Sequence, residues 1–224
     1  DVCSSDLEFG RAWKSAFGAV ISNSRLWLAS ALEMLAYLVT YSIKAFLPIY
    51  ALYTADFSLL AVGLFFSAQE AAHLLTRPVG GRLGDRVGYL TAINTGYLVL
   101  AIGFWLLPYA TVQVELLCIA IIVGAGQGLI FPSTVALVSR CVDTRHLGAG
   151  MGFLGAVRNV GKVAGPLTAG VLLTHMDYSQ VFHLGGAVAL LVVLTLLLWQ
   201  KNYLGWIFPY TKLTNLSKDD AIVR

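Results

Sequence analysis

Residues 77–88 read RPVGGRLGDRVG, and this stretch decides the fold. It holds four glycines, three arginines, one proline and one aspartate, and long apolar segments lie on both sides of it. A charged, glycine-punctuated segment between apolar ones is typical of a tight loop at a membrane surface. Its glycines would let the flanking helices approach each other. We expect Asp85 to find local ion partners or to cap a helix N-terminus.

The composition places the rest of the chain in a membrane. Of the 224 residues, 58% are hydrophobic and only 12% are charged, whereas a soluble domain is typically about a quarter charged. A membrane helix needs about 20 mostly apolar residues. The sequence therefore predicts an all-α membrane protein with six transmembrane helices, at 26–47, 57–75, 89–107, 114–138, 147–173 and 180–199.

The placement of Lys and Arg orients these predicted spans. If the loop at 77–88 is cytoplasmic, the other segments on that side also carry basic residues. The segments on the opposite side, near 50–56, 108–113 and 174–179, carry no Lys or Arg. This bias follows the positive-inside rule. It predicts that both chain ends are cytoplasmic.

The segments outside the predicted bundle of 26–200 need separate treatment. Residues 1–7, DVCSSDL, resemble the in-frame translation of a common short-read sequencing adapter, so we interpret them as an artefact and not as native sequence. Residues 8–25 mix three basic residues with aromatic and aliphatic ones, which fits either an interfacial amphipathic helix or a simple linker. Residues 201–224 form a polar tail, which we expect in the cytoplasm.

A second motif lies in the fifth predicted span, where residues 161–170 read GKVAGPLTAG. Glycines spaced four residues apart let helices pack closely in lipid. Proline inside a helix frees a backbone carbonyl and kinks the axis. We therefore expect Gly161, Gly165, Pro166 and Gly170 to shape the packing of this helix.

Both motifs resemble signatures of the major facilitator superfamily. The pattern Gly81-x-Leu83-x-Asp85-Arg86-x-Gly88 is similar to the loop that joins the second and third helices of a six-helix half in that family, and the glycine-proline run is similar to its fifth-helix signature. The family pattern continues with two basic residues, where this chain has Tyr89 and Leu90. The family's first half often has an arginine three residues before a Gln-Gly pair, where this chain has Gly124. These departures favour the C-terminal half.

The resemblance implies a secondary transporter that moves a small-molecule substrate across the lipid bilayer by rocking two halves about a midplane site. The second six-helix half would be missing from this chain. The style of the motifs resembles drug or metabolite efflux carriers of the plasma membrane that are coupled to protons. In the family, the loop aspartate meets a helix of the opposite half, so in this chain we expect Asp85 to have only local partners, chiefly Arg82, Arg86 or backbone amides of its own turn.

Ionisable side chains inside the spans are candidates for the substrate or proton path, because charges are costly in lipid. These candidates are Glu33, Lys44, Glu70, Arg158 and Lys162. Glu70 and Arg158 lie at similar predicted depth, so we expect them to approach each other, either as a static ion pair or in a shared cavity. His73 fits either a packing histidine or a proton relay.

Other function classes find less support in the sequence. A membrane assembly or sensor subunit that does not transport, built on the same half-fold, is the main alternative, and fully paired, packed charges would favour it. No phosphate-binding loop and no metalloprotease or nucleophile-elbow motif occurs, so we expect no enzyme, cofactor or metal site. The net charge of +3 without a basic run gives no reason to expect a nucleic-acid partner.

Overall fold

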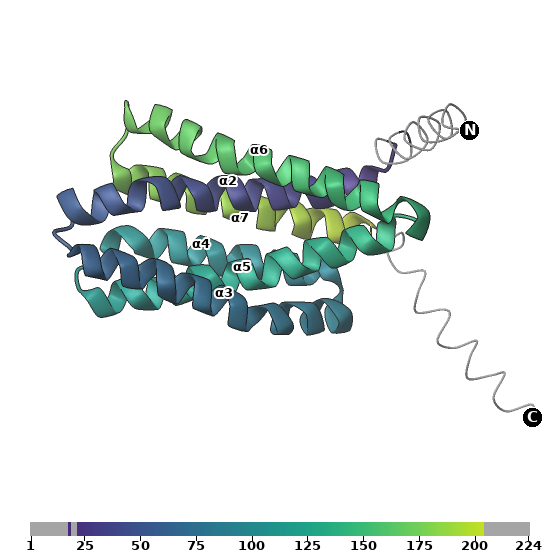
Figure 1. The fold of residues 1–224 in the computed structure, drawn as a ribbon, viewed down its shortest axis with the longest axis horizontal. Helices are drawn as coiled ribbons and strands as arrows, with labels where there is room; N and C mark the ends of the chain where they lie inside the picture. Colours follow the sequence, from purple (N-terminus) through teal and green to yellow (C-terminus); the bar gives the residue numbers. More distant parts are fainter. Residues whose placement is uncertain (1–17, 19–21, 204–224) are drawn as a thin grey trace, which may run out of the picture.

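In the computed structural model, Gly18 and residues 22–203 are described, and the second range forms a bundle of six long helices (Figure 1). The helices are α2 (Ser24–Tyr53), α3 (Leu59–Val87), α4 (Tyr89–Leu106), α5 (Gln113–Cys141), α6 (Leu147–Leu173) and α7 (Tyr178–Tyr203), with short 3-10 turns η1 (Leu107–Tyr109) and η2 (Thr144–His146). No strand occurs within these residues. The predicted all-α, six-helix architecture is confirmed.

Five of the six described helices are long and apolar enough to cross a membrane. The exception is α6, although its bounds coincide with the predicted span at 147–173. This helix carries Arg158 and Lys162 together with several glycines, which contribute little apolar surface. The position of α6 in the bundle therefore depends on its helical neighbours more than on its own apolarity.

The predicted loop at 77–88 is wrong, because this stretch is helical up to Val87. Helix α3 continues through Pro78, and Gly88 alone separates it from α4, with a φ of 94° that glycine adopts without strain. Helix α2 likewise continues past Pro48 to its end at Tyr53. Charged residues end the apolar part of a span, but they do not interrupt the hydrogen-bonded backbone of a helix.

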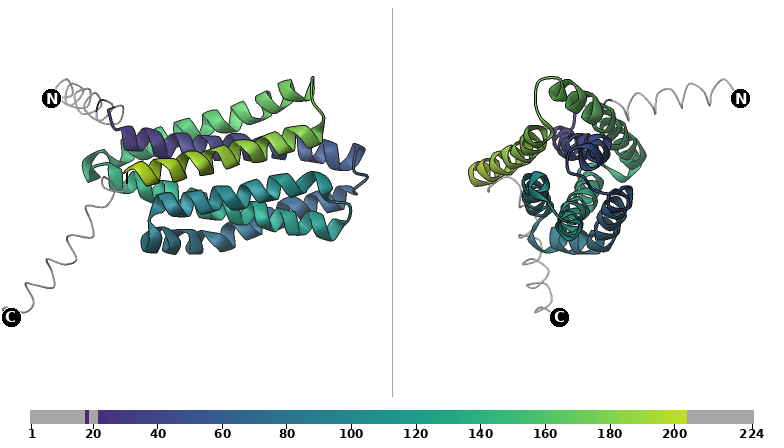
Figure 2. Two further views of the ribbon diagram at one scale, coloured as in Figure 1. Left: turned by 180° about the vertical axis from the view of Figure 1, so that it is seen from behind. Right: turned by 90° about the vertical axis from the view of Figure 1, so that its left-hand side faces the viewer.

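The six helices are arranged around α2 and α5. Helix α6 packs mainly on α2, both α3 and α4 pack on α5, and α7 packs on α4. The end-on view in Figure 2 shows α2 and α5 at the centre, with α3 and α4 on opposite sides of α5. Helices α3 and α6 scarcely touch each other.

The core and the exposed apolar surface lie on different sides of these helices. The core joins α2, α3, α4, α5 and α7, and Tyr97 is fully buried in it, donating its hydroxyl hydrogen to the carbonyl oxygen of Leu32. Large apolar side chains are exposed on the two flanking helices, among them Leu74, Leu75 and Val79 of α3 and Val160, Val163 and Leu167 of α6. In a membrane protein such side chains face lipid or another packed element.

The first described helix begins two residues before the predicted bundle. Asn23 caps α2, since its side-chain oxygen accepts hydrogen bonds from the backbone N–H groups of Arg25 and Leu26 at 3.1 and 3.2 Å. The adapter-like residues 1–7, most of the lead-in 8–25 and most of the tail 201–224 lie outside the described residues.

Candidate functional site

A buried ion pair joins α2 to α6. Glu33 of α2 has a fully buried side chain, and its Oε1 lies 2.6 Å from Nε of Arg158. The other carboxylate oxygen accepts a hydrogen bond of 2.6 Å from the hydroxyl of Thr134 on α5. The side chain of Arg158 is 29% exposed, so the pair is open on the arginine side. Three helices thus meet at one carboxylate.

A second, more exposed ion pair joins α2 to α3. Nζ of Lys44 lies 2.5 Å from Oε1 of Glu70, and the two side chains are 28% and 53% exposed. The other oxygen of Glu70 lies 3.4 Å from Nδ1 of His73. Nε of Arg77 donates to Nε2 of the same ring over 3.3 Å, which makes Nε2 the acceptor. These contacts form a row of polar side chains along α3, from Glu70 through His73 to Arg77.

Aromatic rings connect the two ion pairs. Tyr37 of α2 stacks on Phe131 of α5, with ring centroids 4.3 Å apart, and His73 meets Phe131 edge-on at 5.3 Å. The charged groups of Arg158 and Lys162 lie over the ring of Tyr37, at 5.6 and 5.0 Å from its centroid. We call the following set the charged cluster: Glu33, Tyr37, Tyr41, Lys44, Glu70, His73, Phe131, Arg158 and Lys162.

All five sequence-predicted charged residues belong to this cluster, but they are paired differently from our expectation. Of the two alternatives given for Glu70 and Arg158, the direct ion pair is wrong, because each residue pairs with another partner. Helices α3 and α6, which carry these two residues, are separated by α2 and α5. The similar depth predicted for Glu70 and Arg158 was also wrong, because the second predicted span stopped at residue 75, whereas α3 ends at Val87.

Four residues of this region were not singled out from the sequence: Tyr37, Tyr41, Phe131 and Thr134. Tyr37 and Phe131 carry no charge, and Thr134 is one of many hydroxyl residues in the chain. Tyr37 could have been identified from the sequence, because it lies four residues after Glu33 and therefore on the same helix face. Phe131 and Thr134 are on α5, and only the packing of α5 against α2 brings them to the site.

A neutral hydrogen-bond chain lies next to the charged cluster. Nε2 of Gln69 on α3 donates to Oε1 of Gln127 on α5 over 3.2 Å, and Nε2 of Gln127 donates to the hydroxyl of Thr40 on α2 over 3.2 Å. All three side chains are buried. The chain ties α2, α3 and α5 together without using a charge.

The glycines of the fifth-helix motif differ in their contacts. A Cβ atom added at Gly161 or Gly165 would collide with the carbonyl oxygen of Met34 or Leu38 on α2. At Gly170 the nearest atom, on the ring of Phe46, would be 3.5 Å away, which is ordinary contact. Pro166 lies inside the continuous helix α6. Gly161 and Gly165 are therefore the positions where α2 and α6 approach each other closely.

In the 77–88 motif, the glycine that packs closely on α5 is Gly80, and not Gly81, which the sequence singled out. Gly81 has no heavy atom within 4 Å of an added Cβ, whereas at Gly80 the carbonyl oxygen of Gly128 on α5 would be 2.5 Å away. Gly88 is the positive-φ break between α3 and α4. Arg86 is exposed in the last turn of α3.

Asp85 has partners that we did not expect. Its Oδ1 accepts a hydrogen bond of 2.5 Å from the hydroxyl of Tyr89 and lies 3.4 Å from Nη2 of Arg140 at the end of α5. The guanidinium of Arg140 also lies over the Tyr89 ring, 4.8 Å from its centroid. The expected pairing with Arg82, Arg86 or backbone amides was wrong, and Gly88, not Asp85, is the N-cap of α4.

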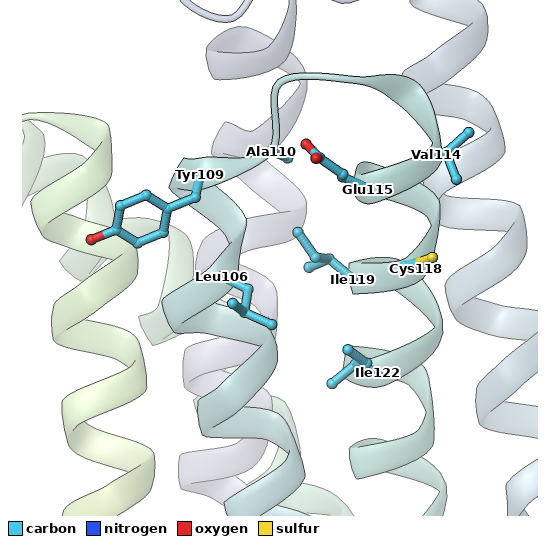
Figure 3. A pocket seen from close by; sticks show the side chains of 8 residues that line it. All are labelled: Leu106, Tyr109, Ala110, Val114, Glu115, Cys118, Ile119 and Ile122. Atoms are coloured by element: carbon cyan, nitrogen blue, oxygen red, sulfur yellow. The ribbon is translucent and has the colours of Figure 1, made fainter.

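A surface groove elsewhere on the bundle shares no lining residue with the charged cluster. It has a volume of about 350 Å³ and lies between the end of α4 and the start of α5 (Figure 3). Its lining is mostly aliphatic, and the carboxylate of Glu115 is occupied by the N–H groups of Thr111 and Val112, at 2.8 and 3.3 Å. In addition, no group of three His, Cys, Asp or Glu side chains within the described ranges is placed to hold a metal ion. The charged cluster is therefore the candidate site.

Comparisons with known proteins agree with this arrangement. The sequence model of a family described as Major Facilitator Superfamily matches residues 12–213. The riboflavin transporter RibZ of Clostridioides difficile (strain 630) is 25% identical over 113 residues, which are 50% of this chain and 25% of that protein. The MFS-type transporter Rv1250 of Mycobacterium tuberculosis is 31% identical over 120 residues, covering 52% of this chain and 20% of that protein.

A third relative covers more of the chain. The quinolone resistance protein NorA of Staphylococcus aureus (strain N315) is 22% identical over 157 residues, which are 69% of this chain and 40% of that protein. This chain thus spans less than half the length of each of these three relatives.

Proposed function

Because this chain belongs to the Major Facilitator Superfamily, we propose that it forms one six-helix half of a secondary active transporter that moves a small solute by alternating access. The chain is a multi-pass membrane protein with the helix count of such a half. A whole carrier of this kind has two halves that rock about a site near the bilayer midplane.

The charged cluster is the observation that carries this proposal. Two acids and three bases lie on membrane helices, where a charge is costly and usually marks a solute or ion path. Lys44, Glu70 and Arg158 each keep 28–53% of their side chains exposed. A purely structural set of charges would be expected to be closed off, as Glu33 is. The exposed edge of the cluster gives a solute access to it.

We further propose that the apolar surface of α3 and α6 is covered by the second half. Both helices border the charged cluster, and both expose Leu and Val side chains next to it. A partner half packed on this surface would enclose the cluster between the two halves. The departures at Tyr89 and Gly124 support assignment of this chain to the C-terminal half. The basic residues near 77–88 support cytoplasmic chain ends in a plasma-membrane protein.

Uptake into proteoliposomes tests the transport proposal. The carrier that contains this chain would be reconstituted, a pH gradient imposed, and accumulation measured for riboflavin and a quinolone, the solutes named by two relatives, and for a wider panel of small solutes. Proton-coupled efflux predicts that the gradient raises accumulation of at least one solute several-fold. Glu70→Gln should remove most of this stimulation, because Glu70 is the more exposed acid of the cluster.

The exposed residue Arg145 in η2 provides a matched control for charge removal. Arg145→Gln should transport like the parent. If correctly folded carrier moves no solute of the panel with or without a gradient, the transport proposal fails, and an assembly or sensor role becomes the better explanation.

The contacts of Asp85 lead to a separate prediction about gating. Asp85 and Arg140 are more than 60% exposed, so their pair should contribute less than about 1 kcal/mol to stability. We expect Asp85→Asn to leave membrane insertion and thermal unfolding unchanged and to lower the transport rate, because a carboxylate at this end favours one access state by contacting a helix N-terminus of the opposite half.

Tyr89→Phe separates the two roles of Asp85, since it removes the 2.5 Å hydrogen bond and keeps the carboxylate. Vesicle transport at matched protein level is the measurement. Normal transport by Asp85→Asn would show that this segment only connects two helices.

A further inference from the structure

The five charged residues of the cluster do not balance. Lys44, Arg158 and Lys162 contribute three positive charges, and Glu33 and Glu70 contribute two negative ones. Lys44 and Glu70 form one pair, and Arg158 and Glu33 form the other. Lys162 is left without a carboxylate within 4.0 Å in the part of the chain that the structure describes. The excess is therefore one positive charge, at Lys162.

The surroundings of Lys162 make this excess costly in the absence of an anion. Arg158 lies one helical turn away on the same face of α6, so two bases share the single buried carboxylate of Glu33. The other charged groups in or next to the charged cluster are those of Glu33 and Lys44 on α2, and Glu70, His73 and Arg77 on α3. None of them is an acid free of a basic partner. A negatively charged ligand would restore the balance.

Aromatic rings hold the Lys162 ammonium in place. Its Nζ lies 5.0 Å from the centroid of the Tyr37 ring and 5.7 Å from that of Tyr41, within the range of cation–π attraction. Both tyrosines and Lys162 are only partly buried. The ring of Tyr37 already stacks on Phe131 and lies beneath the charged groups of Arg158 and Lys162. The partly exposed ring of Tyr41 is therefore the aromatic surface next to the Lys162 ammonium that a ligand can contact, which suits a ligand with an acidic group and a flat ring.

We propose that the solute recognised by the charged cluster is a small organic anion with a flat aromatic ring, whose carboxylate pairs with Lys162 and whose ring packs against Tyr41. This inference rests on the proposed function, because it names the solute class of the same site. It differs from the alternative that Lys162 pairs permanently with an acid of the opposite half, in which case Lys162 would serve stability and not recognition.

Equilibrium binding to the purified carrier in nanodiscs tests the inference without requiring transport. Three planar probes of nearly the same shape differ only in charge: 2-naphthoate, neutral 2-naphthamide and cationic 2-naphthamidine. Saturated decahydro-2-naphthoate keeps the carboxylate and removes the aromatic ring. We expect 2-naphthoate to bind about tenfold or more tightly than the other three, as a charge-assisted hydrogen bond and ring stacking predict.

Variants of Lys162 locate the preference. Lys162→Gln should remove the advantage of 2-naphthoate over 2-naphthamide, and Lys162→Arg should keep most of it. Arg145→Gln, the exposed control, should bind all probes like the parent. Thermal unfolding of each variant shows whether the protein is folded. If Lys162→Gln does not fold, the Lys162→Arg variant still tests the inference.

Several results would overturn the inference. One is equal binding of the acid, the amide and the amidine by the parent protein. Another is a carboxylate preference that survives Lys162→Gln. A third is a Lys162→Gln variant that loses thermal stability while its 2-naphthoate affinity is unchanged, which would assign Lys162 to an acid of the opposite half. Equal binding of the saturated acid would remove the aromatic requirement.

The proposed function and this inference fail in distinguishable ways. If 2-naphthoate binds selectively and no gradient drives its uptake, the binding site is as proposed and the transport proposal fails. If uptake is observed for neutral or cationic solutes without any preference for the acid, the chain is part of a transporter and the anion inference fails.

Discussion

Replacing Gly161 and Gly165 together by alanine is expected to destabilise the carrier by about 3 kcal/mol or more, because two added Cβ atoms would collide with backbone oxygens of α2. Backbone cannot rotate away as a flexible side chain can, so α6 must move off α2. The free energy of unfolding, measured by titration with sodium dodecyl sulfate, and the yield of monodisperse protein are the readouts.

The same helix offers the control for this double variant. Added Cβ atoms at Gly152 and Gly155 meet no heavy atom within 4 Å. The alanine double variant at these positions should be neutral or more stable, by up to about 1 kcal/mol per site, because alanine favours the helix over glycine. Equal effects of the two double variants would show that close packing on α2 is not what the motif glycines provide.

Removing the charge of Glu33 is expected to be the most damaging single substitution in the charged cluster. Glu33→Gln leaves Arg158 without its carboxylate inside the bundle, and breaking a buried ion pair costs about 3–5 kcal/mol. We expect a value near the lower limit, about 3 kcal/mol, because 29% of the Arg158 side chain is exposed to solvent. The same unfolding titration measures the change.

A double-mutant cycle then tests whether the pair acts as a unit. The variant that carries both Glu33→Gln and Arg158→Gln should be more stable than Glu33→Gln alone, since it leaves no unpaired charge. The cycle on Lys44 and Glu70 is the matched comparison, and its coupling should stay below about 1 kcal/mol because that pair is exposed. Simple additivity at Glu33 and Arg158 would contradict the structural role of this pair.

The sequence predicted the number of helices well, because apolar runs in this chain are long and the charged breaks between them are clear. It predicted the helix ends less well. In α3 the apolar part stops near Leu75, but the helix continues for twelve residues to Val87. Hydropathy detects the membrane boundary, whereas the helix ends only where Gly88 takes a positive φ.

This error at one helix end also explains the wrong ion pair. Measured from Val87 at 1.5 Å per residue, Glu70 lies about 26 Å from the end of its helix, which is close to the depth of Lys44, about 30 Å from Ser24. Glu33 and Arg158 lie about 14 and 17 Å from the starts of α2 and α6 on the same rise. With the observed helix ends, the depths alone match Glu70 with Lys44 and Glu33 with Arg158.

The remaining features of the site depend on which helices are neighbours, and the order of the helices in the chain does not determine this. Thr134 and Phe131 reach the charged cluster because α5 packs between α2 and α3. The partnership of Asp85 with Arg140 likewise requires the ends of α3 and α5 to meet. Tyr89 lies only four residues after Asp85, but Gly88 breaks the helix between them, so the helical i,i+4 spacing could not have predicted their hydrogen bond either.

The limited apolarity of α6 has a consequence for how the protein is made in the cell. A segment with Arg158, Lys162 and many glycines partitions poorly into lipid when it leaves the translocon alone. Helix α2 precedes it in the chain and supplies the carboxylate and the backbone surface that α6 needs. Insertion of α6 therefore has to follow that of α2. A defect at Glu33 in α2 would leave α6 outside the membrane, and quality-control proteases would then degrade the chain.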